Sequence, residues 1–194
     1  MLNENFVLFG VPIQTNKLNI DNDVLIEYCY KKKEIDQGRD FSNIGGWQSD
    51  DLNLQDTELQ PFIEELKNNI MSYVIQCGFK TDLKYKLDNI WININGYKDH
   101  NKPHIHPNCL FSGVYYIKTP DNCGNIVFKH PANNMQYDWI QQLKKEFIST
   151  NSGEWFLSSE KGKMFIFPSW LLHYVLPNLN KKEDRISLAF NIIV

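Results

Sequence analysis

The first half of the chain contains one segment with a clear helical pattern. Between residues 56 and 78, apolar side chains recur at steps of three and four residues, as in an amphipathic helix. They are Leu59, Phe62, Ile63, Leu66, Ile70, Tyr73, Val74 and Cys77. Asp56 or Thr57 can cap the start of this helix, and Gly78 is a suitable stop. Weaker patterns predict two more helices, at residues 24–33 and 137–148.

After residue 88 the pattern changes from helical to alternating. In residues 89–97, Ile90, Ile92 and Ile94 alternate with polar or aromatic neighbours, as expected of a strand buried on one face. Further segments rich in β-branched and aromatic residues follow at 110–118, 125–130, 154–159, 163–169, 171–177 and 185–194. With a short strand around His104, about eight strands are expected. This count indicates a double-sheet jelly roll or a small barrel, with the N-terminal helices packed on one sheet.

Length and charge narrow the possibilities further. The 194 residues suffice for one compact domain, which we expect to be mainly β with flanking helices (α+β). Residues 1–87 would supply helical and extended support, and residues 88–194 the jelly-roll core. A net charge of −3 gives no basic surface for nucleic acid, and no apolar window is long enough to cross a membrane.

The cysteines and the first residues bear on location. The four cysteines are far apart and form no C-x-x-C motif, which argues against a disulfide framework or a zinc knuckle. No basic residue precedes the first apolar stretch, so a signal peptide is not expected. Free thiols in a cytoplasmic protein are the simplest interpretation. A homodimer is the default expectation for the oligomeric state.

Three of the five histidines are candidate metal ligands. His104 and His106 are two residues apart, so on a strand both imidazoles would point to one face. Imidazole suits Fe, Zn, Cu and Ni, but a pair needs further ligands, and His173 in a later strand is the best candidate. His100 and His130 occupy a polar loop and a strand end. Isolated H-x-H pairs are common, so the metal hypothesis depends on His173 and on the concave mouth of a jelly roll.

A second candidate site lies at the start of the last strand. Arg185 and Ser187 are two residues apart and therefore face the same side. An arginine fork beside a hydroxyl is a natural receptor for a carboxylate. An isolated arginine at a strand start would more simply face solvent. Next to the histidine set, the carboxylate site is the better interpretation.

Four segments, HIHPNCLFSGVYYI, GNIVFKHP, KGKMFIFPSWLLHYVLPN and DRISLAFN, together resemble the 2-oxoglutarate/Fe(II)-dependent oxygenase family of bacteria and their viruses. The resemblance runs in order from Trp91 to the C-terminus. It implies a double-stranded β-helix, a cupin-like jelly roll. It also implies a non-haem iron dioxygenase that uses Fe(II), 2-oxoglutarate as cosubstrate and O2 to hydroxylate an unidentified substrate, in a host cytoplasm if the protein is viral.

The resemblance also assigns roles to individual residues. His104 would be the first iron ligand, His173 the distal ligand, and Arg185 with Ser187 the anchor of 2-oxoglutarate. The family usually has a carboxylate where this chain has His106, so a three-histidine site is expected. Such a site attracts Fe(II) less strongly than one with a carboxylate ligand, and its affinity for iron depends more strongly on pH. An alternative alignment pairs His106 with Asn108, but Asn is a poor iron ligand.

Other pocket residues follow from the same resemblance. Tyr115 or Tyr116 would contact a carboxylate of the cosubstrate. Three asparagines are expected to be polar pocket residues: Asn93, Asn95 and Asn191. Residues 33–51 and 131–153 could cover the pocket mouth and set specificity. Two rival functions remain open, a three-histidine cupin-like enzyme that does not use 2-oxoglutarate and a non-catalytic structural or binding module on the same fold.

Overall fold

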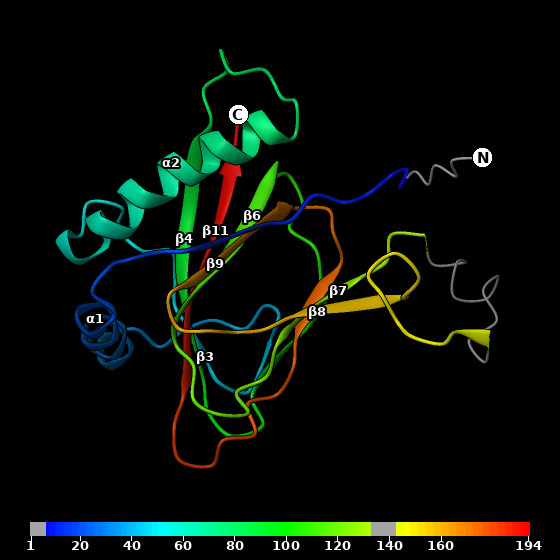
Figure 1. Cartoon of the computed structure of the whole chain (residues 1–194). Coiled ribbons are helices and arrows are strands. Elements are labelled where there is room, and N and C mark those ends of the chain that lie inside the picture. The colour runs from blue at the N-terminus through cyan, green and yellow to red at the C-terminus, as the bar shows by residue number, and fades with distance from the viewer. Residues whose placement is uncertain (1–6, 133–142) are drawn as a thin grey trace, which may run out of the picture.

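Two antiparallel sheets face each other in the computed structural model, which describes residues 7–132 and 143–194 (Figure 1). The strands are β1 (Gln14–Lys17), β2 (Asn43–Ile44), β3 (Trp47–Gln48), β4 (Lys86–Asn95), β5 (His100–His104), β6 (Phe111–Lys118), β7 (Ile126–Lys129), β8 (Glu154–Leu157), β9 (Lys163–Pro168), β10 (His173–Val175) and β11 (Arg185–Ile193). The larger sheet has the order β1-β9-β6-β11-β4-β3, and the smaller has the order β2-β5-β10-β7-β8.

The strands from β4 onward form the jelly-roll part of the molecule. Four of them (β9, β6, β11 and β4) lie in the larger sheet and four (β5, β10, β7 and β8) in the smaller. Each corresponds to a segment in which the sequence pattern predicted a strand. The prediction of a mainly β chain with few helices is confirmed.

Alternation along the long strands gives the larger sheet two different faces. On β4, Ile90, Ile92 and Ile94 are buried in the apolar core that also contains the helices. Their neighbours Trp91 and Asn93 face the space between the two sheets, where they line a cavity. The same strand therefore holds the helix layer on one side and supplies polar groups to the interior on the other.

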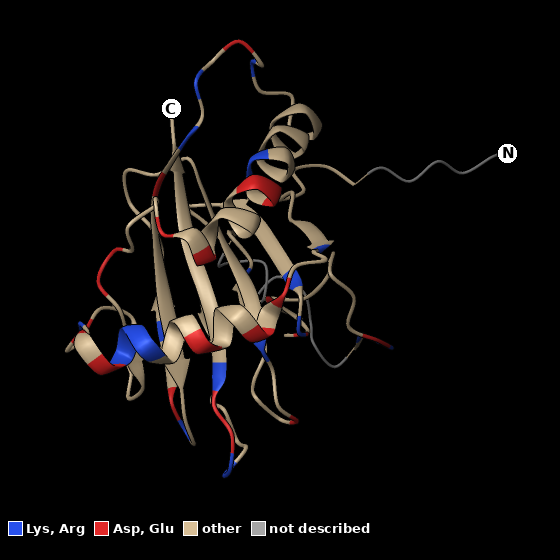
Figure 2. Ribbon diagram, turned by 90° about the vertical axis from the view of Figure 1, so that its left-hand side faces the viewer, with Lys and Arg blue, Asp and Glu red and all other residues tan. Residues whose placement is uncertain are grey.

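The two α-helices of the described residues, α1 (Asn22–Ile35) and α2 (Gln60–Gln76), lie on the same side of the larger sheet. Phe62 of α2 is fully buried, and its ring centroid lies 5.2 Å from that of Tyr115 on β6 and 6.0 Å from that of Phe190 on β11. Figure 2 shows both helices in front of the long strands, with acidic and basic residues interspersed along them. Their apolar stripes thus face the sheet, and their charges face away from it.

The ends of α2 differ in part from the expectation. A 3-10 turn, η1 (Thr57–Leu59), precedes the helix, and the Asp56 side chain makes no capping hydrogen bond. The Asp56 carboxylate instead accepts from the hydroxyl of Tyr28 at 2.7 Å and lies 2.8 Å from the Lys32 ammonium. It therefore joins α1 to the start of α2. Gly78 has φ +71°, the left-handed conformation that ends a helix, as predicted.

Three short strands before residue 50 did not emerge from the sequence pattern. β1 pairs with β9, β2 with β5 and β3 with β4. β2 and β3 have two residues each, which is too short for an alternating pattern to be visible. They form because open edges of the two sheets offer unpaired backbone groups.

The helix predicted at residues 137–148 is not supported where it can be checked. Residues 137–142 lie outside the described residues, and residues 143–148 do not form an α-helix. Leu143 is 79% exposed, so it lacks the buried face on which that prediction rested. Among the residues that the structure describes, no helix has the length and apolar character needed to cross a membrane.

Replacing Phe62 by Ala should lower the free energy of unfolding by about 3–5 kcal/mol, because it leaves a cavity between α2 and the sheet. Urea unfolding followed by circular dichroism measures this loss. The matched control is Ile75→Ala on the same helix, where the side chain is 62% exposed and the change should be about 0.5 kcal/mol or less. Equal effects of the two substitutions would show that α2 is not held to the sheet through Phe62.

Candidate metal centre and its pockets

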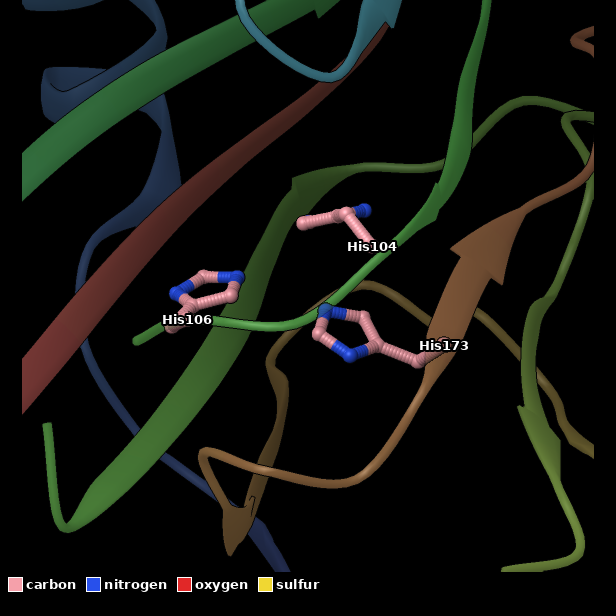
Figure 3. A group of neighbouring side chains, drawn as sticks. All are labelled: His104, His106 and His173. Atoms are coloured by element: carbon pink, nitrogen blue, oxygen red, sulfur yellow. The ribbon is translucent and has the colours of Figure 1, made fainter. Parts of the chain in front are cut away.

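Three histidine side chains converge between the two sheets (Figure 3). One possible ligand nitrogen from each of His104, His106 and His173 lies within 4.8 Å of the other two. His104 ends β5 and His173 begins β10, and the two residues are directly paired across these strands. β5 ends before His106, but the His106 backbone N–H donates to the carbonyl of Ser169 at 2.9 Å. This bond keeps the His106 ring beside the other two.

All three rings are held through Nδ1. His104 and His173 bond through Nδ1 to the backbone carbonyl two residues earlier, over 2.7 and 2.8 Å. His106 bonds through Nδ1 to Oδ1 of Asn191, over 2.6 Å. Because these oxygens only accept, each Nδ1 carries the hydrogen and each Nε2 keeps a lone pair. The Nε2 atom of His106 is buried and has no hydrogen-bond partner among the described residues.

Burial keeps the three imidazoles neutral. It lowers the pKa of His104, and it lowers the pKa of His106 to about 4. The pKa of His173 lies well below its ordinary value, first because of burial and then because of repulsion by His104. Neutral imidazole is the form that binds a metal. The site is therefore already in its metal-binding protonation state near neutral pH.

A narrow cavity extends from the histidines into the space between the sheets, and its lining includes Arg185, Ser187, Tyr116 and Asn93. We call it the inner cavity. Arg185 is 1% exposed, and its Nη1 donates to the backbone carbonyls of Cys123 and Leu176. The guanidinium remains the charged form, although burial lowers its pKa. A buried cation thus stands on the cavity wall next to the histidine cluster.

Polar atoms on this wall lack partners within the described chain. They are Nη2 of Arg185, the hydroxyl of Tyr116 and Oδ1 of Asn93. Buried polar groups normally have hydrogen-bond partners, because leaving them unpaired is costly. A carboxylate in this cavity would accept from both Arg185 and Tyr116. The donor set therefore fits an acidic ligand reaching from the histidines toward Arg185.

The two candidate tyrosines are separated by the alternation of β6. Tyr116 faces the inner cavity, whereas Tyr115 faces the helices, where its hydroxyl donates to Oδ1 of Asn22 at 2.8 Å. Tyr115 therefore faces away from the space between the two sheets, so of the two alternatives the structure does not favour Tyr115 as a contact of a ligand bound there. Consecutive strand residues point to opposite faces, which leaves Tyr116 as the candidate.

The remaining candidate residues differ in whether they lie near the histidine cluster. Asn95 lines the inner cavity, as expected. Asn108 is exposed in the turn after His106 with φ +65° and does not line the cavity between the sheets, so the structure does not support the alternative alignment. His100 and His130 make local bonds, to the Lys98 carbonyl and from the Ala132 N–H. Both lie outside the histidine cluster.

A wider pocket is also lined by His104 and His106, but not by His173 or Arg185. Its volume is about 360 Å³, and its walls include Arg39, Phe41 and Trp91. We call it the outer pocket. Part of its wall comes from residues 33–51, which were expected to cover the site. The sequence did not single out Arg39 or its neighbour in the pocket, Asn89, because each stands alone in an ordinary polar context.

Comparison with known proteins gives the site its context. A family model described as "Putative 2OG-Fe(II) oxygenase" matches residues 89–191, which include the three histidines and Arg185. A search of curated proteins found no significant match. Several solved structures match over most of the chain.

Three of these structures illustrate the range. A prolyl-4-hydroxylase from Pseudomonas putida has a TM-score of 0.63 at 13% identity, covering 93% of this chain and 92% of that chain. The viral collagen prolyl hydroxylase from Paramecium bursaria Chlorella virus-1, solved as a 2-oxoglutarate complex, has a TM-score of 0.61 at 14% identity, covering 93% and 94%. HygX from Streptomyces hygroscopicus, with nickel and 2-oxoglutarate bound, has a TM-score of 0.62 at 9% identity, covering 94% and 82%.

At these identities the structural likeness establishes the fold, the double-stranded β-helix of 2-oxoglutarate oxygenases. The family model covers more than half of the chain and includes the whole histidine cluster. It favours the oxygenase interpretation over both rival functions. The chain therefore belongs to the 2OG-Fe(II) oxygenase family and is an enzyme that uses Fe(II) and 2-oxoglutarate.

Proposed function

We propose that His104, His106 and His173 bind Fe(II) through their Nε2 atoms in this 2-oxoglutarate-dependent oxygenase. The observation that carries this proposal is the convergence of three neutral imidazoles whose Nδ1 atoms are all engaged. Three protein ligands leave coordination positions for 2-oxoglutarate and O2. When bound, the iron and its cosubstrate supply the oxidising chemistry: O2 and 2-oxoglutarate give succinate and CO2, and one oxygen atom hydroxylates the substrate.

We further propose that the inner cavity binds 2-oxoglutarate, with Arg185 as its anchor. The unpaired Nη2 of Arg185 and the Tyr116 hydroxyl would donate to the carboxylate distant from the metal. Such charge-assisted bonds are strong in a cavity that excludes water. Ser187 lies on the same face as Arg185 and lines the same cavity, so its hydroxyl would add a further contact.

The outer pocket is the proposed place for the hydroxylated substrate. Its wall includes His104 and His106 but not Arg185, which lines the inner cavity, and its volume of about 360 Å³ suits a small molecule or a single side chain. The substrate would then meet the metal without displacing the cosubstrate. The single-domain organisation, a homodimer and a cytoplasmic location stay predictions from the sequence.

Replacing His173 by Ala should weaken Mn(II) binding by more than about 100-fold, because even indirect partners of metal ligands contribute 10- to 100-fold. Isothermal calorimetry with Mn(II) as the air-stable probe measures this, and circular dichroism checks the fold. In air with Fe(II) and 2-oxoglutarate, the wild type should release succinate slowly without substrate, and the variant should not.

The matched control is His100→Ala, which removes a histidine outside the cluster and should leave Mn(II) affinity unchanged. Wild-type affinity in His173→Ala would remove this residue from the metal site. Tight Mn(II) binding in a wild-type protein that neither binds nor decarboxylates 2-oxoglutarate would instead contradict the proposed cosubstrate site.

Replacing Tyr116 by Phe should raise the dissociation constant of 2-oxoglutarate by roughly tenfold to a hundredfold. The lost hydrogen bond to a carboxylate is worth about 1.5–3 kcal/mol. Calorimetry with the Mn(II)-loaded protein measures the change. Stability should fall by less than about 1 kcal/mol, because the Tyr116 hydroxyl lies near the Ser159 side chain but makes no hydrogen bond of ordinary geometry within the described chain.

Tyr115→Phe provides the mirror-image control. It removes the hydrogen bond to Asn22, so it should cost about 1 kcal/mol of stability and leave 2-oxoglutarate affinity unchanged. Loss of 2-oxoglutarate affinity in Tyr115→Phe rather than in Tyr116→Phe would mean that the cosubstrate does not occupy the inner cavity.

A further inference from the structure

The His106 ring is held differently from the other two rings. His104 and His173 bond to backbone carbonyls of their own chain segments, which no side-chain substitution removes. His106 bonds to the side chain of Asn191, 85 residues later on β11. The orientation of His106 therefore depends on one buried amide group.

Asn191 stands in a row of directly paired residues on three neighbouring strands. It lies opposite Asn89 of β4 and opposite Ser112 of β6. Ser112 Oγ donates to Oδ1 of Asn191 at 2.7 Å, and Nδ2 of Asn191 donates to Oδ1 of Asn89 at 3.0 Å. Asn191 is 7% exposed, and both the oxygen and the nitrogen of its amide make hydrogen bonds inside the protein.

The carboxylate of Asp51 determines which way the side-chain amides of Asn89 and Asn191 are turned. Nδ2 of Asn89 lies 3.3 Å from each carboxylate oxygen of Asp51, and an ionised carboxylate only accepts hydrogen bonds. Asn89 must therefore turn its oxygen toward Asn191, and Asn191 must turn its own oxygen toward His106. Nδ1 of His106 then carries the hydrogen, and Nε2 is left with the lone pair.

The row also reaches the outer pocket. Nη2 of Arg39 lies 2.5 Å from a carboxylate oxygen of Asp51. The Asp51 side chain is half-exposed. Arg39, Asn89 and Asn191 all line the outer pocket together with His106. An occupant of this pocket would touch the same side chains that orient His106.

We propose that Asn191 is the positioning residue for His106, and that Asn89, which lies in the wall of the outer pocket and is itself oriented by Asp51, fixes the orientation of Asn191. The proposal rests on the proposed role of His106 as a metal ligand. Because the row joins the pocket to the ligand, binding in the outer pocket and metal affinity should influence each other reciprocally.

The test compares Asn191→Ala with the wild type in two measurements. Long-range ¹H–¹⁵N spectra of the metal-free protein report which ring nitrogen of each histidine carries the hydrogen. His106 should lose its single Nδ1–H form, while His104 and His173 keep theirs. Calorimetry should show Mn(II) binding weakened by about 10- to 100-fold. Asn191→Asp keeps an acceptor for His106 and should restore the Nδ1–H form and most of the affinity.

Two further variants test the extension to the pocket. Asn89→Ala should give a smaller loss of Mn(II) affinity, and the double variant with Asn191→Ala should bind no more weakly than Asn191→Ala alone, since both act through one bond. Asn43→Ala is the control. Asn43 is a buried asparagine near Arg39 that bonds to the Phe41 N–H and stands outside the row, so its loss should leave the affinity unchanged.

An unchanged His106 form and unchanged Mn(II) affinity in Asn191→Ala would overturn the positioning role. An effect in Asn191→Ala with none in Asn89→Ala would overturn the link to the outer pocket. If Asn191→Ala does not fold, the nearly isosteric Asn191→Leu takes its place in both measurements, and an unchanged His106 form there contradicts the positioning role. Failure of the iron site itself is separate, because only then does His173→Ala bind Mn(II) like the wild type.

Discussion

The strict alternation of sides along the central strands of the larger sheet is the constraint on which both the core and the site depend. On β4, β6 and β11 one set of residues packs against the helices and the other faces the space between the sheets. A shift of register by one residue would exchange the two sets and expose the apolar core. Burial of that core therefore also fixes which polar side chains reach the interior.

Electrostatics explain why this interior suits a dianion. Three neutral imidazoles, the proposed ligands, would leave the full charge of Fe(II) uncompensated, whereas a carboxylate ligand would cancel part of it. Arg185 adds another buried positive charge and donates to backbone carbonyls rather than to a carboxylate. Isolated buried charge is costly, so a ligand with two carboxylates stabilises both ends of the cavity together.

The sequence predicted most of the site because its signals are local or periodic. The spacing of His104 and His106, and of Arg185 and Ser187, follows from the two-residue repeat of extended chain. The same repeat separates Tyr115 from Tyr116, but choosing between them requires knowing which face of β6 is covered by helices. Periodicity alone gives no such sign, since both faces are buried.

Long-range partners could not be predicted in the same way. Asn191 was expected near the pocket, yet its bond to His106 depends on the pairing of β11 with β4 and β6, which a single sequence does not specify. Arg39 and Asp51 come from a segment with only two-residue strands. The proposed ligands His104 and His173 stand on the paired strands β5 and β10, and His106 follows β5, whereas part of the outer-pocket wall comes from the segment that contains only the two-residue strands β2 and β3. Such short elements are held by few bonds, so they can change between related enzymes while the iron chemistry stays the same.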